Sequence, residues 1–240
     1  MDPKVNAGGT RVRWGIGDFF WIYFAGLLAS IVGGAVGVGI AGDTPGHTSG
    51  LTIALSAGAL YATWIGTVVF VSRTKGRGSL TSDFGLTVRA SRSWVLLVGA
   101  ALQVLLGALV LPLVNLVHNE KQDVVEQLKN AGGPKLVVLL VVAGLVAPVC
   151  EELLFRGVLL RAFRRRFSVE VAIGASALIF ALTHLLGDPT LGVVAILPAL
   201  FALGVISGCA AVWVGDLSVS IPLHMGFNLV TLAAYATLVR

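Results

Sequence analysis

Seven long apolar runs alternate with short polar or charged stretches along this chain. Each run approaches the roughly 20 residues that a helix needs to cross the hydrocarbon core of a bilayer. The pattern therefore predicts an all-α, polytopic transmembrane helix bundle of seven to eight spans, eight being reached if one long run is split. The predicted spans are residues 19–40, 51–72, 94–116, 136–160, 169–187, 191–214 and 218–238.

The composition agrees with a membrane location. Of the 240 residues, 56% are hydrophobic and only 12% are charged, whereas average soluble domains carry about 25% charged residues. The net charge of +5 sits in loops beside apolar runs, so it predicts contact with the lipid bilayer and no nucleic-acid partner. We expect residues 1–240 to form a single membrane domain. The two cysteines predict neither a disulfide nor a zinc motif.

Lysine and arginine are concentrated in alternate connections. They gather in residues 4–13, 73–92 and 161–166. Cytoplasmic loops carry the excess of basic residues, so we expect a cytoplasmic N-terminal segment at 1–18, an uncleaved first span and, with seven spans, an external C-terminus. The compact chain without a targeting segment favours a multi-pass protein of a bacterial plasma membrane.

Two adjacent carboxylates, Glu151 and Glu152, follow the apolar run that begins at Leu136. A charge at the centre of a bilayer is disfavoured by roughly 2.5–3.5 kcal/mol even on insertion scales. The pair therefore predicts a functional site that faces protein or water. Adjacent residues of a regular helix point about 100° apart, so we expect only one of the two carboxylates to face the histidines described next.

Three stretches of the chain each place two polar or aromatic side chains four residues apart, on one helix face. Such faces converge inside a helix bundle, where ligand and metal sites are built. We therefore expect an intramembrane polar cavity, open toward the cytoplasm, within a catalytic core at 136–238. The three pairs are Glu152 with Arg156, Phe180 with His184, and His224 with Asn228.

Two kinds of chemistry are compatible with these residues. Two imidazoles and a carboxylate can hold Zn²⁺ and leave a position for water, which makes Glu151, His184 and His224 candidate metal ligands and leaves the other carboxylate as a base. Without a metal, a glutamate and a histidine could still activate water. In both, Arg156 neutralises Glu152.

Asn228 has two candidate roles beside this set. It can orient His224, or it can donate a hydrogen bond to a developing oxyanion. A different class of function stays open: acids and histidines inside spans also occur in proton-coupled transport, and a non-catalytic immunity or adaptor protein could use the same cavity.

Three other motifs are set aside. The GxGD sequence that ends at Asp18 lies before the first span and lacks a second intramembrane aspartate. The Gly-Ala-Ser sequence that ends at Ser176 lies in the middle of an apolar run. The GxxxG pairs at 33–37 and 204–208 indicate close helix packing.

Taken in order, Glu151-Glu152-x-x-Phe155-Arg156-Gly157, Phe180-x-x-x-His184 and His224-x-x-x-Asn228 resemble the CPBP family, the CAAX prenyl proteases and bacteriocin-processing (Abi-like) proteins. The apolar sequence 201–208 resembles a further, weaker motif. The resemblance covers about residues 150–230. It implies an intramembrane metalloendopeptidase that cleaves a membrane-associated peptide or protein substrate.

The same resemblance implies a role for each site residue. Glu151 would be the water-activating base or a metal ligand, and Glu152 with Arg156 would form a supporting pair. His184 and His224 would be metal ligands or would act on the water and the oxyanion. Asn228 would bind the oxyanion or orient a histidine.

The depth of the site residues leads to one further expectation. At about 1.5 Å per residue, His184 lies roughly 22 Å along its helix from Val169, deeper than Glu151 or His224 lies from its own helix end. The three groups meet if the fifth helix extends outside the hydrocarbon, so we predict helix over 164–170. Residues 119–130 predict a solvated connector or a short amphipathic surface helix.

Overall fold

The computed structural model describes residues 12–44, 47–117, 133–187 and 190–238, and its regular elements are helices. This confirms the predicted all-α bundle. Short helices α3 (Leu80–Phe84) and η1 (Ala90–Arg92) lie in the second connection. The long helices are α1 (Ile16–Ala41), α2 (Gly50–Lys75), α4 (Val95–Leu116), α9 (Val169–Gly187), α10 (Leu191–Val214) and α11 (Ser220–Leu238).

The fourth apolar run forms one continuous helical rod of changing geometry. It passes through α6 (Gly133–Val141), η2 (Val142–Val146), α7 (Ala147–Glu151), η3 (Glu152–Leu160) and α8 (Arg161–Arg164), and both η2 and η3 are π-helical. Pro148 explains the first π segment, because its nitrogen cannot donate to the carbonyl of Gly144 and the helix ladder must shift.

Six described helical stretches are long and apolar enough to cross a membrane, so the chain is a multi-pass membrane protein. The seventh predicted span, 218–238, folds as α11, and the total of seven stays a prediction. The six stretches are Ile16–Ala41, Gly50–Lys75, Ala90–Leu116, Gly133–Arg164, Val169–Leu186 and Leu191–Val214.

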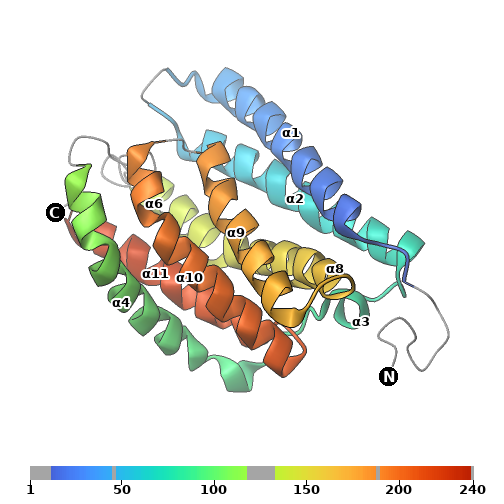
Figure 1. The fold of residues 1–240 in the computed structure, drawn as a ribbon. Coiled ribbons are helices and arrows are strands. Elements are labelled where there is room, and N and C mark those ends of the chain that lie inside the picture. The colour runs from blue at the N-terminus through green and yellow to red at the C-terminus, as the bar shows by residue number, and fades with distance from the viewer. Residues whose placement is uncertain (1–11, 45–46, 118–132, 188–189, 239–240) are drawn as a thin grey trace.

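The helices pack as pairs around the central rod. The α1–α2 hairpin lies on one side of the bundle and α4 with α11 on the opposite side, while α9 packs against α10 (Figure 1). The GxxxG pairs act as predicted: Gly33 and Gly37 approach α2 at Leu55 and Thr52, and Gly204 approaches Ala177 of α9. Small residues at these crossings let the helix backbones come close.

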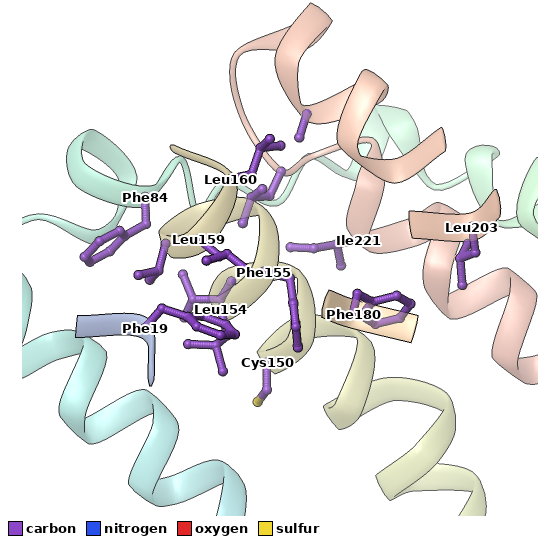
Figure 2. Packing of buried hydrophobic residues seen from close by; sticks show 14 of the residues in the cluster. Phe19, Phe84, Cys150, Leu154, Phe155, Leu159, Leu160, Phe180, Leu203 and Ile221 are labelled. Atoms are coloured by element: carbon purple, nitrogen blue, oxygen red, sulfur yellow. The ribbon is translucent and has the colours of Figure 1, made fainter. Parts of the chain in front are cut away.

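Aromatic and aliphatic side chains fill the centre of the bundle around the π-helical segment. Phe155 lies between Phe19 of α1 and Phe180 of α9 (Figure 2), with ring centroids 5.3 Å and 5.2 Å away. Edge-to-face contacts of this kind stabilise a pair beyond the area it buries. The aromatic cluster joins the hairpin, the rod and α9 at the level of Glu152.

The connections rich in arginine and lysine meet at one end of the bundle. Lys75 pairs with Asp18 at 2.6 Å, and the backbone N–H of Leu217 donates to the carbonyl of Gly85 at 2.9 Å. The alternation predicted from the basic residues is therefore present in the fold. Asp18 also accepts hydrogen bonds from the Gly15 N–H and the Trp21 indole N–H, and Ser176 Oγ donates to the carbonyl of Phe155 at 3.4 Å, so both residues make structural contacts.

Asp216 holds the turn between α10 and α11 at this end. Although partial burial opposes its ionisation, hydrogen bonds from Ser218 and the charges of Arg89 and Arg92 keep the pKa of Asp216 below its usual range. Arg89 lies 2.8 Å from the carboxylate. The ionised side chain therefore ties the η1 segment, which precedes α4, to the α10–α11 turn.

The predicted helix over 164–170 is wrong. Helix α8 ends at Arg164, residues 165–168 form a turn, and α9 begins at Val169. The backbone N–H groups of Arg166 and Phe167 both donate to the carbonyl of Phe163 (2.8 and 2.9 Å), which closes the turn. The predicted amphipathic segment at 119–130 lies outside the described residues.

Two glycines make the contact between α4 and α11 testable. A Cβ added at Gly99 would overlap the carbonyl oxygen of Leu223, whereas one at Gly107 meets nothing nearer than 3.8 Å. We expect Gly99→Ala to destabilise the protein by about 1–3 kcal/mol, as overpacking does, and Gly107→Ala, the matched control, to be neutral or stabilising. Thermal unfolding in detergent checks this. A Gly99→Ala protein as stable as the control would contradict the close crossing.

Candidate active site

A fully buried ion pair forms the base of the site. Arg156 Nη1 lies 3.1 Å from Glu152 Oε1, and the two side chains are 1% and 0% exposed. The guanidinium also lies 4.4 Å from the ring centre of Phe180 and donates from Nη2 to the carbonyl of Gly204 at 3.4 Å. Charge, π-face and carbonyl replace part of the water that both ions lose on burial, while Glu152 Oε2 and Arg156 Nη1 have no hydrogen-bond partner among the described residues.

His224 of α11 lies against this pair. Its Nδ1 is 3.0 Å from Glu152 Oε1. A carboxylate only accepts hydrogen bonds, so Nδ1 carries the proton and donates it. In the neutral imidazole, Nε2 is then the acceptor, and it faces Glu151 Oε2 at 3.7 Å. Glu152 therefore fixes both the orientation and the tautomer of His224.

Both carboxylates reach the same imidazole ring, so the expectation that only one would face the histidines is wrong for His224. Glu152 meets the ring at Nδ1 and Glu151 at Nε2. The reason is that the two ring nitrogens point in different directions and that the helix widens into η3 at Glu152. The Glu151 side chain keeps 18% of its surface exposed while Glu152 keeps none, so Glu151 is the accessible carboxylate.

His184 of α9 approaches through Phe180. Its Nδ1 lies 2.9 Å from the carbonyl oxygen of Phe180, which can only accept, so Nδ1 is the protonated nitrogen here too. The Phe180 ring packs edge-on against His184 and His224, with centroids 5.0 Å and 5.7 Å away. Within the part of the chain that the structure describes, no hydrogen bond or ion pair joins His184 to Glu151 or His224.

Asn228 makes a different contact from the predicted one. Its Nδ2 donates to the carbonyl of Ala143 at 2.8 Å, inside the π-helical segment η2. A π turn leaves carbonyls without their usual partners, and the amide satisfies one of them. Asn228 thus anchors α11 to the central rod one turn from His224, and its role in a reaction stays a prediction.

Glu151, His184 and His224 have the donor atoms that a metal ion needs, but they are not gathered around one point. Both imidazoles donate Nδ1–H to a carboxylate or carbonyl and leave Nε2 as an acceptor, as metal-bound histidines do. However, no group of three His, Cys, Asp or Glu side chains among the described residues is placed to hold a metal. Glu151 and His224 are brought together as a pair, and His184 is not brought to them.

Phe180 is the site residue whose role sequence reasoning did not foresee. Its ring contacts Phe155, the Arg156 guanidinium and both histidines. In the sequence, Phe180 was the helix-face partner of His184 and part of the family motif Phe180-x-x-x-His184, with no role of its own assigned. An aromatic side chain with this many polar neighbours separates the two imidazoles and supports the buried arginine.

The fold and the pattern of its spans define a multi-pass helical membrane protein. Residues 133–230 match the family described as Rce1-like, type II CAAX prenyl endopeptidase Rce1-like. This confirms the resemblance to the CPBP family over that segment of the chain. No curated protein and no solved structure matches the chain.

The buried ion pair leads to a prediction about stability. Arg156→Met leaves the Glu152 charge buried without its partner, and we expect a loss of about 3–5 kcal/mol. The double variant Glu152→Gln/Arg156→Met removes both charges and keeps an acceptor for His224, so it should recover most of that loss. Thermal unfolding of the two variants in the same detergent measures the difference. A double variant as unstable as Arg156→Met would contradict the pairing.

Proposed function

We propose that this protein is an intramembrane endopeptidase in which Glu151 activates a water molecule for peptide hydrolysis. The observation that carries the proposal is the position of His224 between two carboxylates, one buried and one accessible. The family match over residues 133–230 supports the reaction class.

The attacking water fits between Glu151 Oε2 and His224 Nε2. These two acceptors lie 3.7 Å apart, too far for a direct hydrogen bond, but a water about 2.8 Å from each can donate one of its hydrogens to each of them. Glu151 takes the proton as the water oxygen bonds to the peptide carbonyl carbon. When the C–N bond breaks, Glu151 returns the proton to the leaving amine, so no group is consumed.

The supporting residues have separate tasks in this reaction. Glu152, held by Arg156, keeps the Nε2 lone pair of His224 aimed at the water. Asn228 uses one N–H for Ala143, and we assign its second N–H to the oxyanion that forms on the carbonyl oxygen. Neutral His184 has no proton on Nε2, so its assigned task is to accept a proton or to bind a metal.

We further propose Zn²⁺ as a cofactor with Glu151, His184 and His224 as its ligands, which would require His184 to move toward the other two, since the three are not gathered in the described structure; when bound, the ion would supply a water of lowered pKa. The steps above use the chain's own residues and do not depend on it. The substrate is a membrane-associated peptide or protein tail that enters from the cytoplasmic side. The proposed location is a bacterial plasma membrane with the N-terminus in the cytoplasm.

Glu151→Gln tests the reaction. The variant keeps the shape of the side chain but cannot take a proton, so hydrolysis of a peptide library in reconstituted vesicles should fall by about 10²–10⁴-fold. Glu170→Gln is the matched control, because Glu170 is exposed in the first turn of α9. Products are identified by mass spectrometry. Equal product from wild type and Glu151→Gln would reject the peptidase function and leave the non-catalytic role.

Metal analysis tests the cofactor. Purified wild-type protein should carry about one zinc per chain by elemental mass spectrometry, and His184→Ala or His224→Ala should lose it, because each removes one of the predicted ligands. His47→Ala is the control, since His47 is exposed in the first connection. Full activity in protein stripped of metal would reject the zinc proposal and leave water activation by Glu151 and His224.

A further inference from the structure

The α1–α2 hairpin lies outside the matched segment 133–230, yet α1 packs into that segment near its own beginning. From Phe24 onward most of the large apolar side chains of α1 are exposed, and Phe24 itself is 56% exposed. The large buried side chains of this helix are Phe19, Ile22 and Tyr23. At this level α1 contacts η3, the π-helical segment of the central rod.

Phe19 is the first of three buried rings that lead from α1 to the two histidines. Its centroid lies 5.3 Å from that of Phe155 at an interplanar angle of 65°, and the Phe155 centroid lies 5.2 Å from that of Phe180 at 81° (Figure 2). All three side chains are 1% exposed. We call Phe19, Phe155 and Phe180 the ring series, and its last member contacts both His184 and His224.

The place of the Phe180 ring matters because polar groups of the site pack on it. The Arg156 guanidinium lies 4.4 Å from its centre, and the two imidazoles lie 5.0 Å and 5.7 Å away, centroid to centroid. Phe155 supports the same ring from the central rod. A close-packed interior has few voids and transmits the displacement of one side chain to the next. A change at Phe19 therefore reaches the imidazoles through two intervening rings.

We propose that Phe19 is a positioning residue of the active site, which sets the Phe180 ring, and with it His184 and His224, through Phe155. The proposal rests on the endopeptidase function proposed above. Filling apolar space alone would be done equally by leucine, whereas the angled contacts of the ring series require an aromatic side chain. The hairpin outside the matched segment is then part of the support of the active site.

Phe19→Leu tests the proposal because it keeps an apolar side chain and removes the ring. We expect kcat to fall about tenfold with KM within about twofold, since substrate contacts are unchanged while the alignment of the reacting groups is not. The double variant Phe19→Leu/Phe155→Leu should be no slower than Phe155→Leu, because residues that act through one contact are not additive. Phe19→Met, which also lacks the ring but adapts to irregular space, serves if the leucine variant does not fold.

Phe24→Leu is the matched control. It removes a ring from the same helix, but Phe24 is exposed and its ring packs on Tyr23, so kcat should stay within about twofold of wild type. An unchanged kcat in folded Phe19→Leu, an effect confined to KM, an equal loss in Phe24→Leu, or additive losses in the double variant would overturn the proposal.

Histidine-selective NMR provides a readout without activity. The chain has four histidines, and His184→Ala and His224→Ala assign the two site signals. Ring-proton signals respond to the displacement of a nearby aromatic ring, so Phe19→Leu should move the signals of His184 and His224 and leave that of exposed His47 in place. Site signals unchanged by Phe19→Leu would overturn the inference. If wild-type protein cleaves no peptide, the endopeptidase proposal fails, while the spectra still decide whether Phe19 positions the imidazoles.

Discussion

The buried pair of Glu152 and Arg156 is the constraint on which the site depends. Two ions that leave water must satisfy each other and find further polar partners, or the bundle is destabilised by several kcal/mol. Here the arginine reaches the Gly204 carbonyl and the Phe180 ring, and the glutamate reaches His224. Helices α9, α10 and α11 are thereby held to the central rod at one point.

The backbone of the central rod adapts to this arrangement. Pro148 interrupts the regular ladder three residues before Glu151, and π-helical turns lie on both sides of α7. π segments are rare and are frequent at functional sites. In the first of these segments, η2, the Asn228 side chain donates a hydrogen bond to the carbonyl of Ala143. The histidine helix and the glutamate helix are therefore fastened at two points, the imidazole and the amide one turn further along α11.

The sequence was sufficient to predict the bundle, the alternation of basic connections and the three helices that carry the motifs. These features depend on apolar length, on the positions of lysine and arginine, and on four-residue spacing, which are all visible in one dimension. The difference in exposure between Glu151 and Glu152 could not be predicted from the sequence, because it depends on where the helix widens into η3. The contact of both carboxylates with His224 was missed for the same reason, since a regular 3.6-residue helix was assumed.

Contacts between distant parts of the chain were also beyond the sequence. The turn at 165–168 replaced a predicted helix, because a stretch of arginines has good helix propensity while the path back into the bundle requires a reversal. Phe180 lay four residues before His184, but its contacts with Phe155 and Arg156 of the central rod could be found only from the fold. Periodicity identifies which faces are polar, but it does not identify which face of another helix they meet.

Hydrolysis in water enriched in ¹⁸O, followed by mass spectrometry of the products and of the protein, tests the role of Glu151 most directly. Water activation by Glu151 predicts one ¹⁸O atom in the new carboxyl group of the cleaved peptide after a single turnover, and no label in the protein fragment that contains Glu151. Label in the Glu151 side chain would instead show that the carboxylate attacks the peptide, and would contradict the assignment of Glu151 as the base.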